Sequence, residues 1–148
     1  MAGFTLQRLL ELKKRREEAV GAELAAARAE EEKARRSEAE IRELRAAAAS
    51  GRLSGHAVTV GQLQNSALVV QSLDAQLDQA GEQVRAAKRR VNDCLLDFRT
   101  AFQERRVLDR LKEKRNEEAA AEEVRLDQST MDEIALSRFG RQETETSR

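Results

Sequence analysis

The sequence predicts an all-α protein, an antiparallel two-helix coiled coil whose second helix is the longer one. Three observations support this fold class. Apolar residues recur at heptad spacing from position 63 to position 108, one glycine- and serine-rich break occupies residues 50–55, and the composition is that of long helices. The 148 residues include no proline, tryptophan or tyrosine, and 36% of them are charged. Such a chain cannot fill a thick globular core, and no proline forces a helix to end.

The heptad stripe is the strongest of these signals. One heptad position holds Leu63, Val70, Leu77, Val84, Val91 and Phe98, and the position three residues later holds Ser66, Leu73, Ala80, Ala87, Cys94, Ala101 and Leu108. Twelve of these thirteen positions, which we call the seam, are apolar. An average spacing of 3.5 residues keeps the seam on one face of a helix, where a helix lying alongside can cover it.

The first helix is expected over residues 4–50, with Thr5 as a possible cap. Gly51 is expected to end it in the left-handed conformation, and a turn over residues 51–59 follows. The second helix, expected over residues 60–140, has a clear start signal. Thr59 and Gln62 have the spacing of a capping box, and Val58 and Leu63 that of a hydrophobic staple.

The end of the second helix is expected at Gly140, with residues 141–148 forming a frayed polar tail. Two helices joined by a short turn lie antiparallel, and the pattern suggests that position i of the first faces about position 111 − i of the second. A shift of one heptad stays open, because Lys13, Arg16 and Glu23 weaken the first helix's stripe. Phe4 would then lie near Val107. About 30 residues of the second helix would extend beyond the pairing as the mobile end.

Charge and residue content argue against several classes of function. The 27 basic and 27 acidic side chains cancel, so no large field attracts nucleic acid or an anionic membrane. The single cysteine, Cys94, and the single histidine, His56, stand apart from any catalytic partner or metal-ligand set, so we expect no enzyme activity, cofactor or metal. The sequence has neither an apolar run long enough to span a bilayer nor a secretory signal, which predicts a cytoplasmic protein without membrane insertion.

Two groups of apolar residues are candidate partner surfaces. The first lies on the unpaired part of the second helix, where helical spacing suggests docking into a partner's groove. It comprises Leu126, Met131, Ile134, Ala135, Leu136 and Phe139, and Asp132 beside it is a further candidate contact residue. Self-association or back-folding of this segment remains the alternative. The second comprises Phe4, Leu6 and Leu9 at the start of the chain. These residues either reach a partner or pack against Leu95 and Phe102.

Three blocks of residues resemble one known family in the right order. The opening block is Phe4, Leu6, Gln7, Leu9, Leu10, Leu12 and Lys13. The middle block is Phe98 and Arg99, with residues 108–115 and Glu117. The closing block is Glu122, Arg125, Leu126, Asp127, Gln128, Met131, Asp132, Glu133, Ile134, Ala135 and Arg138. Together they resemble the FliJ family of flagellar type III export proteins, over essentially the whole chain.

The resemblance implies a non-catalytic coiled-coil stalk of the export apparatus, associated with the inner face of the cell membrane only through that apparatus. The implied partners are the hexameric export ATPase, the cytoplasmic domain of the export-gate membrane protein, and export chaperones. We assign two regions to the ATPase. One is the paired end of the rod, which reaches Phe4, and the other is the extension of the second helix through Phe139. The surface assigned to the gate is Ile41, Leu44, Val69 and Leu73.

Other functions remain open at this stage. They are a general coiled-coil adaptor or spacer, a type III secretion stalk outside the flagellum, and a nucleic-acid-binding helical hairpin. The neutral charge argues against the last of these.

Overall fold

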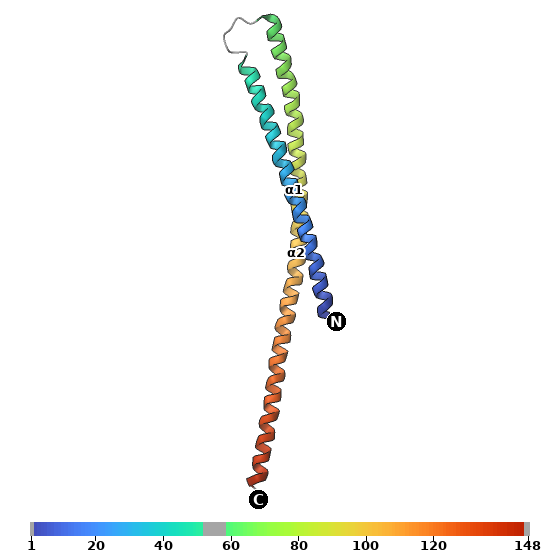
Figure 1. The fold of residues 1–148 in the computed structure, drawn as a ribbon, viewed down its shortest axis with the longest axis vertical. Helices are drawn as coiled ribbons and strands as arrows, with labels where there is room; N and C mark the ends of the chain where they lie inside the picture. Colours follow the sequence, from blue (N-terminus) through green and yellow to red (C-terminus); the bar gives the residue numbers. More distant parts are fainter. Residues whose placement is uncertain (1, 52–58, 147–148) are drawn as a thin grey trace. The chain divides into compact units, whose positions relative to one another are not determined.

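A computed structural model describes residues 2–51 and 59–146, and these contain two α-helices and no strand. Helix α1 spans Ala2–Ser50 with 49 residues, and helix α2 spans Val60–Thr146 with 87 residues. The predicted fold class is confirmed, including the longer second helix (Figure 1). His56, the Val58 staple and most of the expected turn lie outside the described residues.

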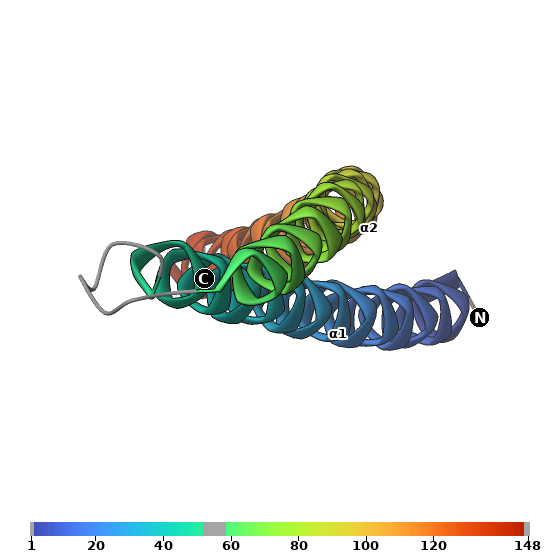
Figure 2. The ribbon, with the colours of Figure 1, turned by 90° about the horizontal axis from the view of Figure 1, so that it is seen from above.

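The chain divides into two compact units. The hairpin unit is residues 12–103, and the tail unit is residues 1–11 together with 104–148. Within the hairpin unit the two helices run side by side in opposite directions (Figure 1, Figure 2). Whether the whole chain acts as a single hairpin domain stays a prediction.

The seam is confirmed as the buried stripe of α2. Every seam position is buried or half-buried except Leu63, which is exposed. A small core in the hairpin unit is formed by Leu24, Ala27 and Cys94, against which Val91, Leu95 and Phe98 pack. The rings of Phe98 and Phe102 stack with centroids 6.5 Å apart. The core is therefore thin, as the low aromatic content requires.

The observed register is not the 111 − i alignment but differs from it by about one heptad, the shift that the sequence left open. A side chain at Gly21 would begin 3.5 Å from the Phe98 ring, and Arg45 forms an ion pair with Asp74. In both pairs, residue i of α1 lies opposite about residue 119 − i of α2, whereas the sequence suggested residue 111 − i. In the tail unit, the Lys112 Nζ donates a hydrogen bond to the Gln7 Oε1 at 3.0 Å, and this pair has the same offset.

Polar residues in the stripe of α1 explain this register. The half-buried carboxylate of Glu38 lies over Gly81, where an added Cβ would come within 3.9 Å of its Oε1. In the predicted register the same carboxylate would meet Leu73, a large apolar side chain. Glu38 is already paired with Arg42 of the same helix at 3.1 Å. Because packing a charged group against a large apolar side chain is still unfavourable, the small residue is the better partner. Heptad spacing alone cannot choose between registers one heptad apart, since both keep the seam covered.

The observed register leaves the first turns of α2 without a partner among the described residues of α1. These turns continue beyond the end of α1 within the hairpin unit (Figure 1). Their exposed apolar residues are Val60, Leu63 and Leu68. This explains why Leu63 is the exception among the seam positions.

Near the turn, the start of α2 is capped as expected, whereas the end of α1 differs from expectation. The capping box is confirmed, because the Thr59 amide donates to the Gln62 side chain and the Gln62 amide donates to the Thr59 hydroxyl. The left-handed conformation expected for Gly51 is wrong, since no described glycine has a positive φ. Instead, the Gly51 amide donates to the Ala47 carbonyl at 3.0 Å, which adds one more helical hydrogen bond.

The outer ends of both helices also differ from expectation. Gly140 keeps a helical conformation, so α2 passes through it and ends at Thr146, and most of the expected frayed tail is helical. Thr5 lies inside α1, which begins at Ala2, and so it does not cap the helix. A glycine commonly ends a helix by taking the left-handed conformation, and Gly140 does not take it.

Candidate functional site

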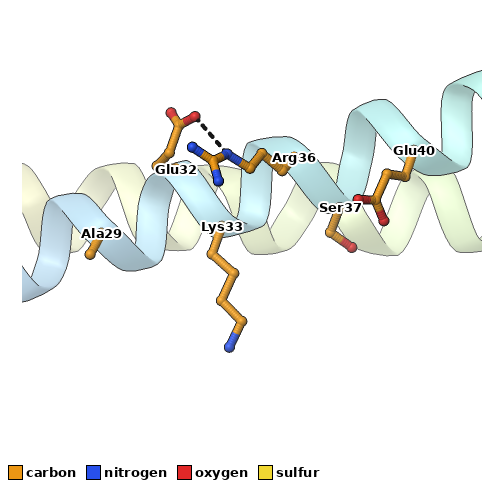
Figure 3. A pocket seen from close by; sticks show the side chains of 6 residues that line it. All are labelled: Ala29, Glu32, Lys33, Arg36, Ser37 and Glu40. Carbon is orange, nitrogen blue, oxygen red and sulfur yellow. Dashed lines mark hydrogen bonds and ion pairs between the residues drawn. The ribbon is translucent and has the colours of Figure 1, made fainter.

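A charged patch on α1 illustrates the surface of the hairpin unit. Its residues lie along one face of this single helix, at Ala29, Glu32, Lys33, Arg36, Ser37 and Glu40 (Figure 3). Glu32 and Arg36 form an ion pair of 3.1 Å, while the Lys33 side chain points away from that pair (Figure 3). Side chains of both charges on an exposed helix face are the ordinary solvated surface of a coiled coil. The patch offers no arrangement suited to catalysis.

The described helices contain neither a metal-binding cluster nor a membrane-spanning segment. Within residues 2–51 and 59–146, no three or more histidine, cysteine or acidic residues are grouped so as to hold a metal ion. Over the same residues, no helix has the length and apolar character needed to cross a membrane. Cys94 is buried in the seam. Two exposed apolar surfaces remain to be described.

The first such surface is a groove in the tail unit, which we call the N-terminal groove. It is lined by Thr5, Leu6 and Leu9 of α1 and by Leu108, Leu111 and Arg115 of α2. Leu10, only 2% exposed, anchors this part of α1. Leu9 and Leu111 remain 41% and 39% exposed, so the groove offers apolar surface that no described residue covers.

The structure corrects the expected packing of the first residues. Leu6 and Leu9 lie with Leu108 and Leu111 in the tail unit, whereas Leu95 packs in the core of the hairpin unit. The shift in register accounts for this difference. Phe4 is exposed, and the Arg8 guanidinium lies over its ring at 5.6 Å from the centroid. This distance allows a cation–π contact.

The second surface is one face of α2 beyond position 112. Every described side chain from position 113 to position 143, which we call the extension, is exposed. One face of it, the extension face, is formed by Met131, Ile134, Ala135, Arg138, Phe139 and Gln142. Met131 and Phe139 are 70% and 69% exposed.

Two predicted residues of the extension do not line this face. Leu126 lies five residues before Met131, which corresponds to about 140° of rotation around the helix. Asp132 lies at the edge of the face, next to Met131 in sequence. The prediction therefore grouped residues from different sides of the helix, because it used their proximity in sequence as well as their spacing.

Ion pairs along the tail unit are local ones between successive turns of α2. Arg125 donates to both oxygens of Glu122, and this hydrogen bonding lowers the pKa of the Glu122 carboxyl. Arg105 and Asp109 form a 2.6 Å pair near the N-terminal groove. Such pairs support a helix but do not cover its apolar face.

The four residues assigned to the export gate fall into two groups. Ile41 and Leu73 are half-buried in the stripes of α1 and α2. Leu44 and Val69 are 59% and 50% exposed and are therefore available to a partner. The exposed Val60 and Leu68 were missed by sequence reasoning, because the predicted register placed the start of α2 beside the end of α1.

Comparison of the sequence with known protein families identifies the family of this chain. Residues 1–144 match the family described as Flagellar FliJ protein. The chain belongs to the FliJ family. Membership agrees with the three blocks of residues and makes the chain a component of the flagellar protein-export apparatus. No match was found among curated proteins or among solved structures.

Proposed function

We propose that this FliJ-family chain is a non-catalytic stalk that binds the hexameric export ATPase, promotes its assembly and activity, contacts the export gate and assists chaperone recycling. We place it in the cytoplasm, held at the inner face of the cell membrane through the export apparatus. The observation that carries the proposal is the extension face, an apolar helix surface that no described residue covers.

Contact with the ATPase is the best-supported part of the proposal. An exposed amphipathic helix is suited to insertion into an apolar groove or the opening of a ring, with residues spaced by three and four positions as anchors. Met131 and Ile134 are three positions apart, and Met131, Ala135 and Phe139 follow at intervals of four, so they provide such anchors. Exposed Phe4 with Leu6 and Leu9 provides a second apolar group in the same unit. A few well-packed residues near the centre of an interface usually contribute most of its binding free energy.

The gate contact is assigned to the hairpin unit. Leu44 and Val69 are exposed there, and changing both to aspartate should weaken binding to the gate's cytoplasmic domain while leaving ATPase stimulation unchanged. Retained gate binding would remove these residues from the proposed surface. Chaperone recycling rests on family membership and has no residue assigned to it.

The ATPase contact is tested with the double substitution Ile134→Asp and Phe139→Asp. Because both side chains are exposed, helicity by circular dichroism should be nearly unchanged, while ATPase binding weakens by about tenfold or more. The matched control is Val107→Asp with Leu96→Asp, which changes two exposed apolar residues away from the extension face. The control should stimulate the ATPase normally. Equal stimulation by both variants would contradict the proposal.

A cellular experiment separates an export stalk from a general adaptor. The tagged chain is captured from its own cells while a deletion strain is tested for swimming. Recovery of the export ATPase and loss of swimming are expected. Normal flagella without any recovered export component would instead favour the adaptor.

A further inference from the structure

Two exposed charges of the extension have no residue of opposite charge on the neighbouring turns. No basic residue stands three or four positions from Asp127, and no acidic residue stands three or four positions from Arg138. By contrast, Arg125 pairs with Glu122 on the adjacent turn. Side chains three or four positions apart are the ones that meet on a helix surface, so both charges are left for contacts outside their own helix.

These two charges lie in the apolar stripe of the extension face. Arg138 lines this face directly. At about 100° of rotation per residue, Asp127 and Arg138 stand about 40° and 20° around the helix from Met131, both on the same side of it. Met131 and Ile134 lie between them along the helix axis. The face therefore has a negative charge on one side of an apolar centre and a positive charge on the other.

We propose that the extension face binds the extension face of a second copy of this chain, with the two helices antiparallel. A face with opposite charges on either side of its centre is complementary to an inverted copy of itself, and the same patch serves both copies. Residue j of one copy then lies level with about residue 265 − j of the other, so Asp127 meets Arg138 twice. A parallel pair would instead bring like charges together.

The apolar residues of the face also meet in this alignment. Met131 of each copy lies level with Ile134 of the other, and these four side chains form the centre between the two ion pairs. Phe139 comes level with about position 126 of the other copy. Val124, which is 57% exposed, lies there on the same side of the stripe. The dimer therefore covers apolar side chains that no described residue of a single chain covers.

The length of the extension fits this pairing. In the tail unit, residue i of α1 lies opposite about residue 119 − i of α2, as Gln7 does with Lys112. Since α1 begins at Ala2, it reaches about position 117 of α2. In the dimer, Thr146 at the end of α2 lies level with about position 119 of the other copy. The two extensions therefore overlap for roughly 40 Å, over the stretch that α1 leaves uncovered.

This dimer covers the face that we also assign to the export ATPase, so the two partners compete for it. The dimer itself does not depend on the ATPase assignment. A chain that stays monomeric overturns the dimer but leaves the ATPase experiment above unaffected. A chain that dimerises but never binds the ATPase contradicts the proposed function and leaves the dimer in place.

Sedimentation equilibrium of the purified full chain, at concentrations up to about 1 mM, is the first measurement. The mass should rise from 16.6 kDa toward twice that value as concentration increases. Asp127→Arg or Arg138→Asp alone makes both ion pairs repulsive, so each should raise the dimer dissociation constant by about tenfold or more. The matched controls Asp97→Arg and Arg90→Asp change exposed residues of the hairpin unit and should leave dimerisation unchanged.

Restoring the opposite charges provides the decisive test. A chain carrying both Asp127→Arg and Arg138→Asp has the two charges exchanged, so it should dimerise with about the affinity of the unaltered chain. The two single variants, mixed together, should also form a heterodimer with that affinity. In a parallel dimer neither single variant would weaken pairing, because like charges already face each other there.

Three results would overturn the proposal: a monomer at all these concentrations, a dimer that neither single variant weakens, or single variants that do not pair when mixed. Circular dichroism checks that the variants stay helical. The regained pairing of the double variant itself shows that neither substitution prevents folding.

Discussion

The seam and the extension are two stretches of the same helix that use apolar residues in different ways. From position 66 to position 108 of α2, the seam is buried or half-buried. From position 113 to position 143, apolar residues also recur at helical spacing, yet each is exposed. The difference shows that helical periodicity identifies an apolar face but not its purpose. A covered face stabilises the fold, whereas an uncovered one is available for binding.

The extension is supported by ion pairs between successive turns of α2, because no second helix packs against it among the described residues. Arg125 pairs with Glu122, and Lys114 lies 4.0 Å from Glu118. Exposed pairs of this kind contribute little to stability, so the helix is weakly held compared with the packed hairpin. Substitutions should therefore affect stability strongly in the hairpin unit and weakly in the extension.

The largest expected difference comes from truncating one buried and one exposed apolar residue. Leu24→Ala removes a core side chain and should lower the free energy of unfolding by about 2 to 4 kcal/mol. Ile134→Ala should change it by less than about 0.5 kcal/mol, because the side chain has no packed partner among the described residues. Chemical denaturation followed by circular dichroism measures both. Similar losses would show that the extension is packed in solution.

Enlarging an alanine should give a somewhat smaller effect. Ala27 is buried between the helices of the hairpin unit, and Ala27→Leu should cost about 1 to 3 kcal/mol through overpacking. The neighbouring Ala26 is exposed, so Ala26→Leu should have almost no effect. Thermal unfolding of the two variants compares them directly. Equal melting temperatures would contradict the close packing of the helices around Ala27.

The smallest expected effect concerns the end of the extension. Gly140 lies within α2 without a positive φ, and an added Cβ there would meet nothing within 4 Å. Gly140→Ala should therefore stabilise this part of the helix by about 0.5 to 1 kcal/mol. Hydrogen exchange of the amides around position 140 should slow. Faster exchange would indicate that the glycine ends the helix after all.

Much of the architecture could be predicted from particular residues. The seam predicted which face of α2 is covered, and Thr59 with Gln62 predicted where that helix begins. These features depend on neighbours within a few turns, so the sequence contains them directly. The glycine positions were misleading, because Gly51 and Gly140 permit a left-handed conformation without requiring it.

The candidate surfaces could be predicted only in part. Met131, Ile134 and Phe139 were identified from their spacing, whereas Leu111 and Arg115 of the N-terminal groove were not recognised as partners of Leu6 and Leu9. A groove between two helices depends on which residues lie opposite each other. That information is absent from either helix taken alone.

The sequence by itself determined two helices of unequal length and the seam between them. It also determined an apolar face on the extension, which lies beyond the reach of the first helix. Only the tertiary structure decided the register. A shift of one heptad leaves the apolar repeat unchanged, so the choice depends on individual contacts across the helices. Gly81 accommodates the Glu38 carboxylate, and Gly21 accommodates the Phe98 ring. These contacts select one alignment because large or charged side chains need a small residue opposite them.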